Sequence, residues 1–317
     1  MESEPEKKRF LTGWHEHHAH LFLGGARRRM EELFETEFPD FRYWKIPLVK
    51  PASEEAIGRV NAWIRECFLP AVKFHDWRKL SVQAALEQAN ADGVSRLEAS
   101  LNVDFSRFGT ERLLREIAEV HAQTAPDLEL KLDLGFVRSQ SVEFQAECFQ
   151  TFLKTAERFP ELGELLGGVD LYDVEDAALP ENFREIFQIA RAAGLKLKAH
   201  VGETGSPEVI RHTAEILNLD EIQHGIRAGE SKETLAFLAD RKTVLNLAPA
   251  SNRILCLFRE EEIQERVRAI FDSKVPFTLS SDDYLLFETS IVEQFQEIAS
   301  IFSEDEQTQI RKNCQNL

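Results

Sequence analysis

The chain lacks the features of disulfide-rich, membrane-spanning and secreted proteins. Its four cysteines are far apart in 317 residues and form no CxxC pair, which argues against a disulfide framework and a cysteine-ligated zinc site. No stretch approaches the roughly 18 apolar residues of a membrane-spanning helix. Residues 1–9 are charged and contain no apolar core of a secretory signal. We therefore expect reduced thiols and a cytoplasmic location.

Basic residues are also scarce. Lysine and arginine total 38 against 55 aspartates and glutamates, so the formal net charge is −17. Binding to a nucleic-acid backbone or to an anionic membrane surface depends on an excess of basic residues. We therefore expect neither partner, and we interpret the acidity as a contribution to solubility.

The order of apolar runs predicts the fold. Short apolar runs alternate with longer helical patterns, without a Gly/Ser linker or a repeat, and this is typical of an α/β protein with a parallel sheet. We predict one domain over residues 1–317, a (β/α)8 TIM barrel. A helical insertion over about 24–83 follows the first strand as a lid, and helices over 289–317 close the barrel. The predicted strands are 10–21, 94–101, 128–136, 165–171, 195–200, 222–224, 243–247 and 275–280.

Four segments with metal-binding or proton-carrying side chains lie at or just after the ends of these runs. In a (β/α)8 barrel the carboxyl ends of all strands meet at one rim, where active sites are found. Residues distant in the chain are therefore expected to converge there. The segments are His18-Ala19-His20, His200-Val201-Gly202-Glu203, His224-Gly225 and Ser281-Asp282-Asp283.

The first segment allows two interpretations, because the run from Trp14 to His20 contains four histidines. Side chains alternate between the two faces of a strand. On this rule only one pair, His15/His17 or His18/His20, can face the barrel axis. We choose His18/His20 because they lie at the carboxyl end of the run. The alternative is a histidine-rich patch on the surface.

The segment around His200 supplies a ligand and an acid. His200 ends an apolar strand, and Gly202 allows a tight bend or a close approach of the backbone to a ligand. Glu203 lies in the following loop, where a partly buried carboxylic acid can keep its proton and act as a general acid. The alternative for Glu203 is a helix-terminal acid stabilised by the helix dipole, since Pro207 is expected to open the next helix.

The last two segments complete the set. His224 can orient or deprotonate a water molecule, or it is a hydrogen-bonded core histidine. Of Asp282 and Asp283, one can bind a metal while the other reaches substrate; the alternative is an aspartate-rich turn. Three imidazoles and one carboxylate with an open position fit Zn²⁺ or a similar divalent ion.

These residues resemble the adenosine deaminase family of metal-dependent barrel hydrolases, over residues 18–287. Five motifs of that family occur in order, and each is weak alone. They are HxHL at His18-Ala19-His20-Leu21, HAGE at His200-Val201-Gly202-Glu203, the GHG-type histidine at His224, CPxSN at Ala248-Pro249-Ala250-Ser251-Asn252, and SxDDP at Ser280-Ser281-Asp282-Asp283-Tyr284.

The resemblance implies a site and an activity. His18, His20, His200 and Asp282 would bind one Zn²⁺ per chain, or another divalent transition metal. Glu203 would protonate a purine ring nitrogen, and His224 with Asp282 would position and deprotonate water. Asp283 would hydrogen-bond the purine N7. The implied function is hydrolytic deamination of a purine nucleoside, purine base or related aromatic amine, with a small molecule as the partner.

The sequence departs from the family pattern around the substrate. Phe22 stands where the family carries an acid for the ribose, and Asp173 stands where a glycine backbone meets the ring. Ala248 replaces a cysteine and Tyr284 a proline. We expect Phe22, Asp173 and Gly202 to contact the substrate, and we expect altered specificity. An adenine base, a modified nucleoside and an N6-substituted purine are alternatives to adenosine.

Two other functions remain open at this point. The first is hydrolysis of an amide or ester, which the single-metal set and the lack of a bridging lysine disfavour, since Lys131 lies within its strand. The second is a non-catalytic binding protein. Outside the motifs, Glu98 is expected to support the metal ligands or to be structural, and Arg138 to form a rim salt bridge or to meet a phosphate. Trp63, Phe68, Phe74 and Trp77 are expected to pack the inserted helices.

Overall fold

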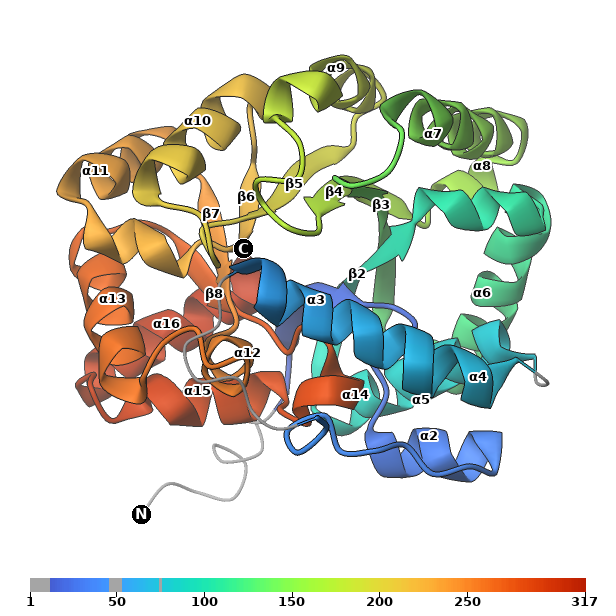
Figure 1. Cartoon of the computed structure of the whole chain (residues 1–317), viewed down its shortest axis with the longest axis horizontal. Helices are drawn as coiled ribbons and strands as arrows, with labels where there is room; N and C mark the ends of the chain where they lie inside the picture. Colours follow the sequence, from blue (N-terminus) through green and yellow to red (C-terminus); the bar gives the residue numbers. More distant parts are fainter. Residues whose placement is uncertain (1–11, 46–52, 74–75) are drawn as a thin grey trace.

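Eight parallel strands form a single barrel-shaped sheet in which each strand pairs with the next in sequence (Figure 1). The computed structural model describes residues 12–45, 53–73 and 76–317. A single bridge between Ala19 and Asp282 joins the first strand to the segment after the last one. The strands are β1 (Trp14–His20), β2 (Val94–Asn102), β3 (Glu129–Val137), β4 (Leu166–Tyr172), β5 (Lys196–Val201), β6 (Glu221–His224), β7 (Val244–Leu247) and β8 (Phe277–Leu279).

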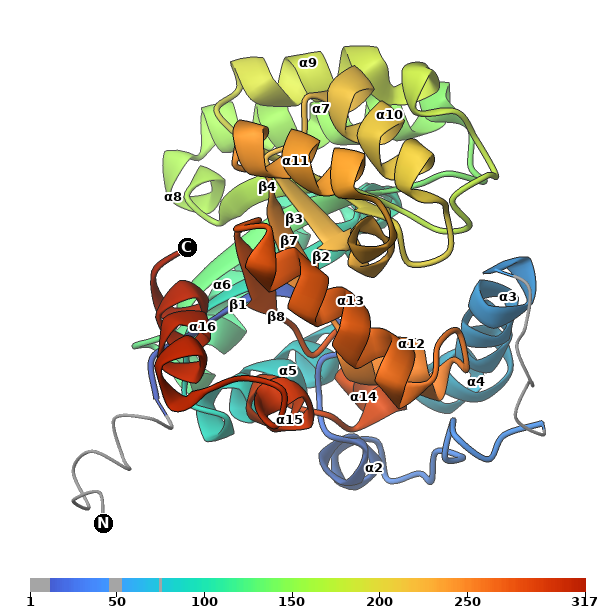
Figure 2. The ribbon, with the colours of Figure 1, turned by 90° about the vertical axis from the view of Figure 1, so that its left-hand side faces the viewer.

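Helices follow the strands and surround the sheet, as Figures 1 and 2 show. All eight predicted strands are present, and the TIM-barrel prediction is confirmed. The main helices between strands are α5 (Trp77–Ala91), α6 (Thr110–Thr124), α7 (Val142–Arg158), α8 (Pro160–Gly163), α9 (Arg184–Ala192), α10 (Pro207–Leu217), α11 (Lys232–Arg241), α12 (Pro249–Ile254) and α13 (Glu260–Asp272). The last helices are α14 (Tyr284–Phe287), α15 (Ile291–Ala299) and α16 (Glu304–Asn316). Short 3₁₀ segments are η2 (Val103–Phe108), η3 (Pro180–Phe183) and η4 (Ile226–Glu230).

The inserted helices between β1 and β2 have their own apolar cluster. They are α2 (Arg27–Phe34), α3 (Ser53–Trp63), the π-helical segment η1 (Ile64–Phe68) and α4 (Leu69–Val72). Trp63 and Phe68 are buried among them and Trp77 packs against them, as predicted, whereas Phe74 lies outside the described residues. Asn61 of α3 approaches the barrel rim, where its side-chain amide lies 3.5 Å from the Asp173 carboxylate. Within the described residues, no helix is long and apolar enough to cross a membrane.

The alternation of side chains on β5 explains why the barrel interior is polar. Leu197, Ala199 and Val201 are buried in the main apolar cluster, together with residues of the surrounding helices. The intervening Lys196, Lys198 and His200 contact acids of other strands. A period of two therefore places three functional groups in a column along the barrel interior.

The prediction that His15 and His17 point away from the interior is wrong for His17. Between Glu16 and Ala19, strand β1 advances three residues while β2 advances two, from Leu97 to Ala99. This extra residue is a β-bulge, which interrupts the alternation of side chains. His17 and His18 consequently both contact residues of the opposite strands, with His17 near Glu221 and His18 near His200.

Side chains satisfy the backbone groups that the bulge removes from the ladder. The His17 carbonyl accepts hydrogen bonds from Lys198 Nζ at 3.1 Å and from the Gln223 amide at 3.4 Å. The His18 N–H lies 3.4 Å from a Glu16 carboxylate oxygen, and the His18 carbonyl accepts from the Asp282 N–H at 3.2 Å. Because these partners are buried, the bulge is a fixed part of the fold.

Candidate metal and catalytic site

Three histidines and one aspartate converge at the carboxyl ends of β1, β5 and β8. One side-chain donor atom from each of His18, His20, His200 and Asp282 lies within 4.8 Å of the other three. The Nε2 atoms of His18 and His20 are each 3.5 Å from Asp282 Oδ1. The rings of His18 and His200 meet edge to face with their centroids 4.6 Å apart. We call these four residues the upper cluster.

The upper cluster fits a divalent metal. The Nε2 atoms of His18 and His200 are buried and have no hydrogen-bond partner among the described residues. Zinc–ligand distances near 2.1 Å in a tetrahedron place ligand atoms about 3.4 Å apart, close to the two separations from Asp282. Within the described part of the chain, Asp282 pairs only with histidines and with no lysine or arginine. The buried carboxylate therefore lacks a lysine or arginine partner among the described residues.

Burial sets the protonation of His18, His20 and Asp282; at His200 burial favours a lower pKa, but the Asp170 carboxylate outweighs it and raises the pKa. Burial, followed by the neighbouring imidazoles, lowers the pKa of His18 well below its usual value, and burial also lowers the pKa of His20. Burial and then the charge of Asp283 raise the pKa of Asp282 to about 7. Neutral imidazole is the form that binds a metal, and a nearby cation would favour the ionised carboxylate.

Asp170 orients His200, and the sequence analysis missed it. Its Oδ1 lies 3.1 Å from His200 Nδ1, and its Oδ2 accepts a hydrogen bond from the Ser100 hydroxyl at 2.5 Å. Burial opposes ionisation, but His200 and Ser100 lower the pKa of Asp170 to about 2. An ionised acceptor on Nδ1 leaves Nε2 free to coordinate a metal. The only sequence signal was an aspartate inside an otherwise apolar strand.

Glu203 and His224 lie beside the upper cluster. His224 Nε2 is 3.7 Å from a Glu203 carboxylate oxygen and 3.9 Å from Asp282 Oδ2. Burial, followed by the charge of Asp282, raises the pKa of Glu203 well above its usual value. Burial lowers the pKa of His224 well below its own. Burial therefore favours a protonated carboxyl at Glu203 and a neutral imidazole at His224, beside the metal ligands.

Two further side chains border the upper cluster. Asp283 is buried, its Oδ1 has no hydrogen-bond partner in the part of the chain that the structure describes, and burial raises its pKa to about 7. The Tyr172 ring lies edge-on to His20 and His200, with centroids 5.5 and 5.6 Å away. A Cβ on Gly135 would stand 2.4 Å from the Tyr172 ring, so the glycine makes room for it. Nothing in the sequence analysis indicated Tyr172.

The predicted substrate contacts have protein partners of their own. The Phe22 ring packs edge to face on Trp77 and Phe105, with centroids 4.8 and 4.9 Å away. The Asp173 carboxylate accepts hydrogen bonds from the N–H and hydroxyl of Ser139. The backbone φ of Asp173 is 91°, in the left-handed region. The φ of Gly202 is 80°, which fits the predicted bend. Substrate contacts of all three residues stay predictions.

Three other polar residues have structural partners. Arg138 is buried and donates to the carbonyl of His200 at 3.1 Å, so the predicted rim salt bridge is not among its contacts within the described residues. Lys131 donates to the carbonyl of Glu164, outside the upper cluster. Glu98 lies in a separate buried network and supports none of the four upper donors directly.

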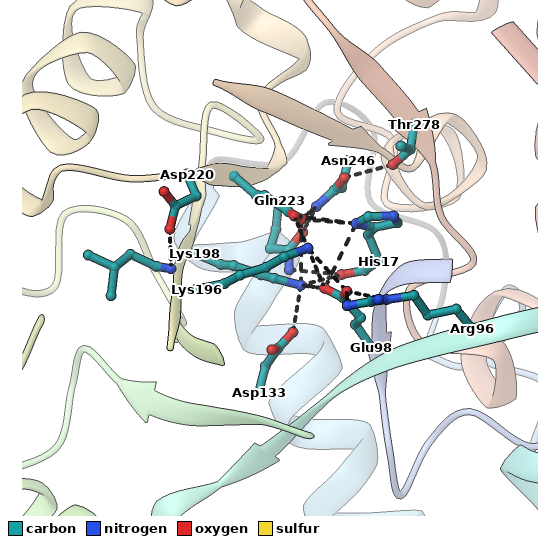
Figure 3. A network of polar contacts seen from close by, with 12 residues as sticks. His17, Arg96, Glu98, Asp133, Lys196, Lys198, Asp220, Gln223, Asn246 and Thr278 are labelled. Atoms are coloured by element: carbon teal, nitrogen blue, oxygen red, sulfur yellow. Dashed lines mark hydrogen bonds and ion pairs between the residues drawn. The ribbon is translucent and has the colours of Figure 1, made fainter. Parts of the chain in front are cut away.

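That second network, drawn in Figure 3, lies further toward the amino ends of the strands. We call it the lower network and define it as His17, Glu98, Asp133, Lys198 and Glu221. Lys198 Nζ is 2.5 Å from Glu98, 2.7 Å from Asp133 and 3.5 Å from Glu221. His17 Nδ1 is 3.2 Å from Glu221. Three of its residues have metal-ligand spacing. The Lys198 ammonium, however, already supplies the cation.

Comparison with known proteins identifies the family. The family model described as "Adenosine deaminase" matches residues 112–316. A putative adenosine/adenine deaminase of Treponema pallidum is 28% identical over 290 residues, covering 89% of this chain and 90% of that protein. The adenine deaminase of Paraburkholderia phytofirmans is 35% identical over 179 residues, covering 56% of this chain and 48% of that protein.

Two solved structures share the fold. An amidohydrolase from Burkholderia ambifaria with bound zinc aligns with a TM-score of 0.78 and 20% identity, over 99% of this chain and 88% of that one. The adenine deaminase of Arthrobacter aurescens aligns with a TM-score of 0.68 and 19% identity, over 96% and 98%. The family model covers well over half of the chain, including the segments of His200, His224 and Asp282. The chain is a member of the adenosine deaminase family of aminohydrolases.

Proposed function

We propose that this protein is a zinc-dependent hydrolytic deaminase of an aromatic amine of the 6-aminopurine type, with one zinc ion per chain. His18, His20, His200 and Asp282 would hold the ion. One observation carries the proposal. The buried carboxyl of Glu203, with its raised pKa, lies beside His224 and the four donor atoms. A proton donor next to a metal site is the arrangement that removal of an amino group from a ring requires.

Zinc in this site would supply Lewis-acid activation of a water molecule. Glu203 holds a proton and delivers it to the ring nitrogen next to the amino-bearing carbon. His224 is neutral near pH 7 and orients the attacking water, while Asp282 is placed to accept its proton. The unpartnered Oδ1 of Asp283 is available to bind a second ring nitrogen. Water and the amine then yield an oxo product and ammonia.

The relatives support a purine as the substrate. Those compared here are named adenine deaminase or putative adenosine/adenine deaminase. Phe22 contacts two aromatic rings where the family resemblance leads one to expect a ribose-binding acid. We therefore propose that a purine base or a modified nucleoside is preferred to adenosine. The four free cysteines support the proposed cytoplasmic location.

The test is turnover by the zinc-loaded protein on a panel of adenine, adenosine and N6-substituted adenines. Ammonia release and the ultraviolet spectrum report the reaction. Glu203→Gln should lower kcat by about 10²–10⁴-fold, the usual contribution of a general acid, with the zinc content unchanged. Glu208→Gln is the matched control, since Glu208 lies on the exposed start of α10. Absence of turnover on every aromatic amine of the panel would refute the proposed function.

A further inference from the structure

The turn that carries Glu203 has little support from the Glu203 side chain. The turn comprises residues 200–204 and begins at the ligand His200. Within the described residues, the Glu203 carboxyl has one hydrogen bond, a long one of 3.5 Å from the Asn252 amide. Its other close polar neighbour is His224, 3.7 Å away. The position of this carboxyl therefore depends on how the backbone of the turn is held.

Glu175 holds that backbone. It lies in the segment between β4 and η3, and its Oε2 accepts a hydrogen bond from the Gly202 N–H at 2.8 Å. Its Oε1 accepts from the Glu203 N–H at 3.0 Å and from Thr204 at 2.7 Å (N–H) and 3.0 Å (hydroxyl). Hydrogen bonds to an ionised acceptor are about twice as strong as neutral ones. One carboxylate thus binds three consecutive amides.

Two arginines bind the carbonyls of the same turn. Arg138 donates to the His200 carbonyl at 3.1 Å. Arg227 donates through its backbone N–H to the Gly202 carbonyl at 3.0 Å, and through its guanidinium to the Thr204 carbonyl at 2.8 Å. The acid meets the N–H groups and the guanidinium groups meet carbonyls. The Glu175 carboxylate therefore holds the N–H groups of the turn, and the two arginines hold its carbonyl groups.

The close approach of Glu175 also requires a small residue directly after the turn. A Cβ on Gly205 would stand 2.3 Å from Glu175 Oε2. The carboxylate therefore packs directly against the backbone at the end of the turn.

We propose that Glu175 is a positioning residue, which fixes the 202–204 backbone and thereby sets where the Glu203 carboxyl lies relative to His200. The part that concerns catalysis rests on the proposed function. Glu175→Gln retains the shape, but it replaces an acceptor oxygen by an NH₂ group that faces backbone N–H groups. At least one of the three amides then loses its partner. A misplacement of about 1 Å in a catalytic group can cost on the order of 10²-fold in rate.

The first test does not depend on activity. Amide hydrogen exchange of Gly202, Glu203 and Thr204 is measured in the zinc-loaded wild type, in Glu175→Gln and in Asp176→Asn. Asp176 is the exposed neighbour and controls for the loss of one negative charge. Exchange at the three amides should become about tenfold faster or more in Glu175→Gln only, because their acceptor is weakened. Unchanged exchange in Glu175→Gln would overturn the proposal, whatever reaction the protein catalyses.

The second test is kinetic. In Glu175→Gln, kcat should fall about 10–100-fold, as for other residues that orient a catalytic group, with KM and zinc content nearly unchanged. Glu175→Asp keeps the charge and should retain part of the rate; it carries the test if the glutamine variant does not fold. In a Glu203→Gln background, Glu175→Gln should have no further effect on turnover. An equal loss of kcat in both backgrounds would show that Glu175 does not act through Glu203.

Discussion

Two adjacent histidines, His17 and His18, belong to two buried clusters that differ in one respect. Both clusters combine histidine with carboxylates at metal-ligand spacing. In the lower network, Lys198 lies between the acids, and the adjoining Lys196 pairs with Glu98 and Glu221. In the upper cluster, no lysine or arginine within the described residues pairs with Asp282. A buried acid without a lysine or arginine partner either keeps its proton or pairs with an external cation, so histidine and acid alone do not identify the metal site.

The pKa values of the buried acids also differ between the two clusters, according to whether a lysine is nearby. Burial opposes ionisation at Glu98, yet the Lys198 ammonium lowers the pKa of Glu98 to about 2. Burial and Asp283 raise the pKa of Asp282 to about 7. Asp133 is an exception in the lower network, because it shares Lys198 with two other acids and burial raises its pKa to about 7. A divalent ion at the upper cluster would act on Asp282 as Lys198 acts on Glu98.

The largest expected contrast is between His18→Gln and His17→Gln. The first removes an imidazole donor from the upper cluster and should abolish stoichiometric zinc binding and turnover. The second leaves the four donors in place, and its amide can still donate to Glu221, so zinc should be retained. Metal analysis of the purified variants measures both. Equal loss of zinc from both variants would contradict the division into two clusters.

Lys198→Met should destabilise the fold. It leaves Glu98, Asp133 and Glu221 buried without their main cation, and breaking a buried ion pair costs about 3–5 kcal/mol. Urea unfolding measures the free energy of unfolding. Lys131→Met is the control on strand β3, since the partly exposed Lys131 donates to the Glu164 carbonyl and lies 3.9 Å from the exposed Glu129 carboxylate, and its loss should cost less than about 1 kcal/mol. A Lys198→Met protein as stable as the wild type would show that the lower network does not need its lysine.

Asp170→Asn should weaken zinc binding by about 10–100-fold, as is usual when the carboxylate behind a metal-binding histidine is removed. Its amide no longer provides a charged acceptor for His200 Nδ1. Titration against a chelator of known affinity measures the change. Asp133→Asn removes the same charge from the lower network and should leave zinc affinity nearly unchanged. Similar losses in the two variants would mean that overall charge, rather than orientation of His200, governs affinity.

The smallest expected effect is the dependence of zinc affinity on pH. The pKa of Asp282 is about 7 without a metal, so the carboxyl is increasingly protonated as pH falls below 7. A proton competes with the metal for this carboxylate, and zinc affinity should fall about tenfold for each pH unit below 7 for that one group. Isothermal titration at several pH values measures this, together with the protons released. Constant affinity between pH 5 and 7 would show that Asp282 does not bind the metal.

The sequence was sufficient for the strands, which follow from local patterns, whereas the four residues of the upper cluster were named by the family resemblance. Apolar runs gave all eight strands, and functional residues at their carboxyl ends were expected to converge. The first helix of the predicted insertion, α2, ends at Phe34, because Glu35 adopts a left-handed conformation. No propensity of the preceding residues indicated that stop.

The features that could not be predicted from the sequence depend on contacts between strands. The bulge at His17 and His18 is held by Lys198, about 180 residues away in the chain, so strict alternation misplaced His17. Asp170 and Glu175 act through partners on β5 and the turn after it, and Tyr172 fits only because residue 135 is glycine. Each of these roles requires the register of one strand against the next.

Anomalous diffraction at the zinc absorption edge, on crystals of the purified protein, tests the central claim most directly. The account predicts one zinc peak per chain, about 2.0–2.2 Å from one side-chain atom each of His18, His20, His200 and Asp282. It also predicts no peak between His17, Glu98 and Glu221. A metal in the lower network, or a zinc-saturated crystal with none at the upper cluster, would contradict it.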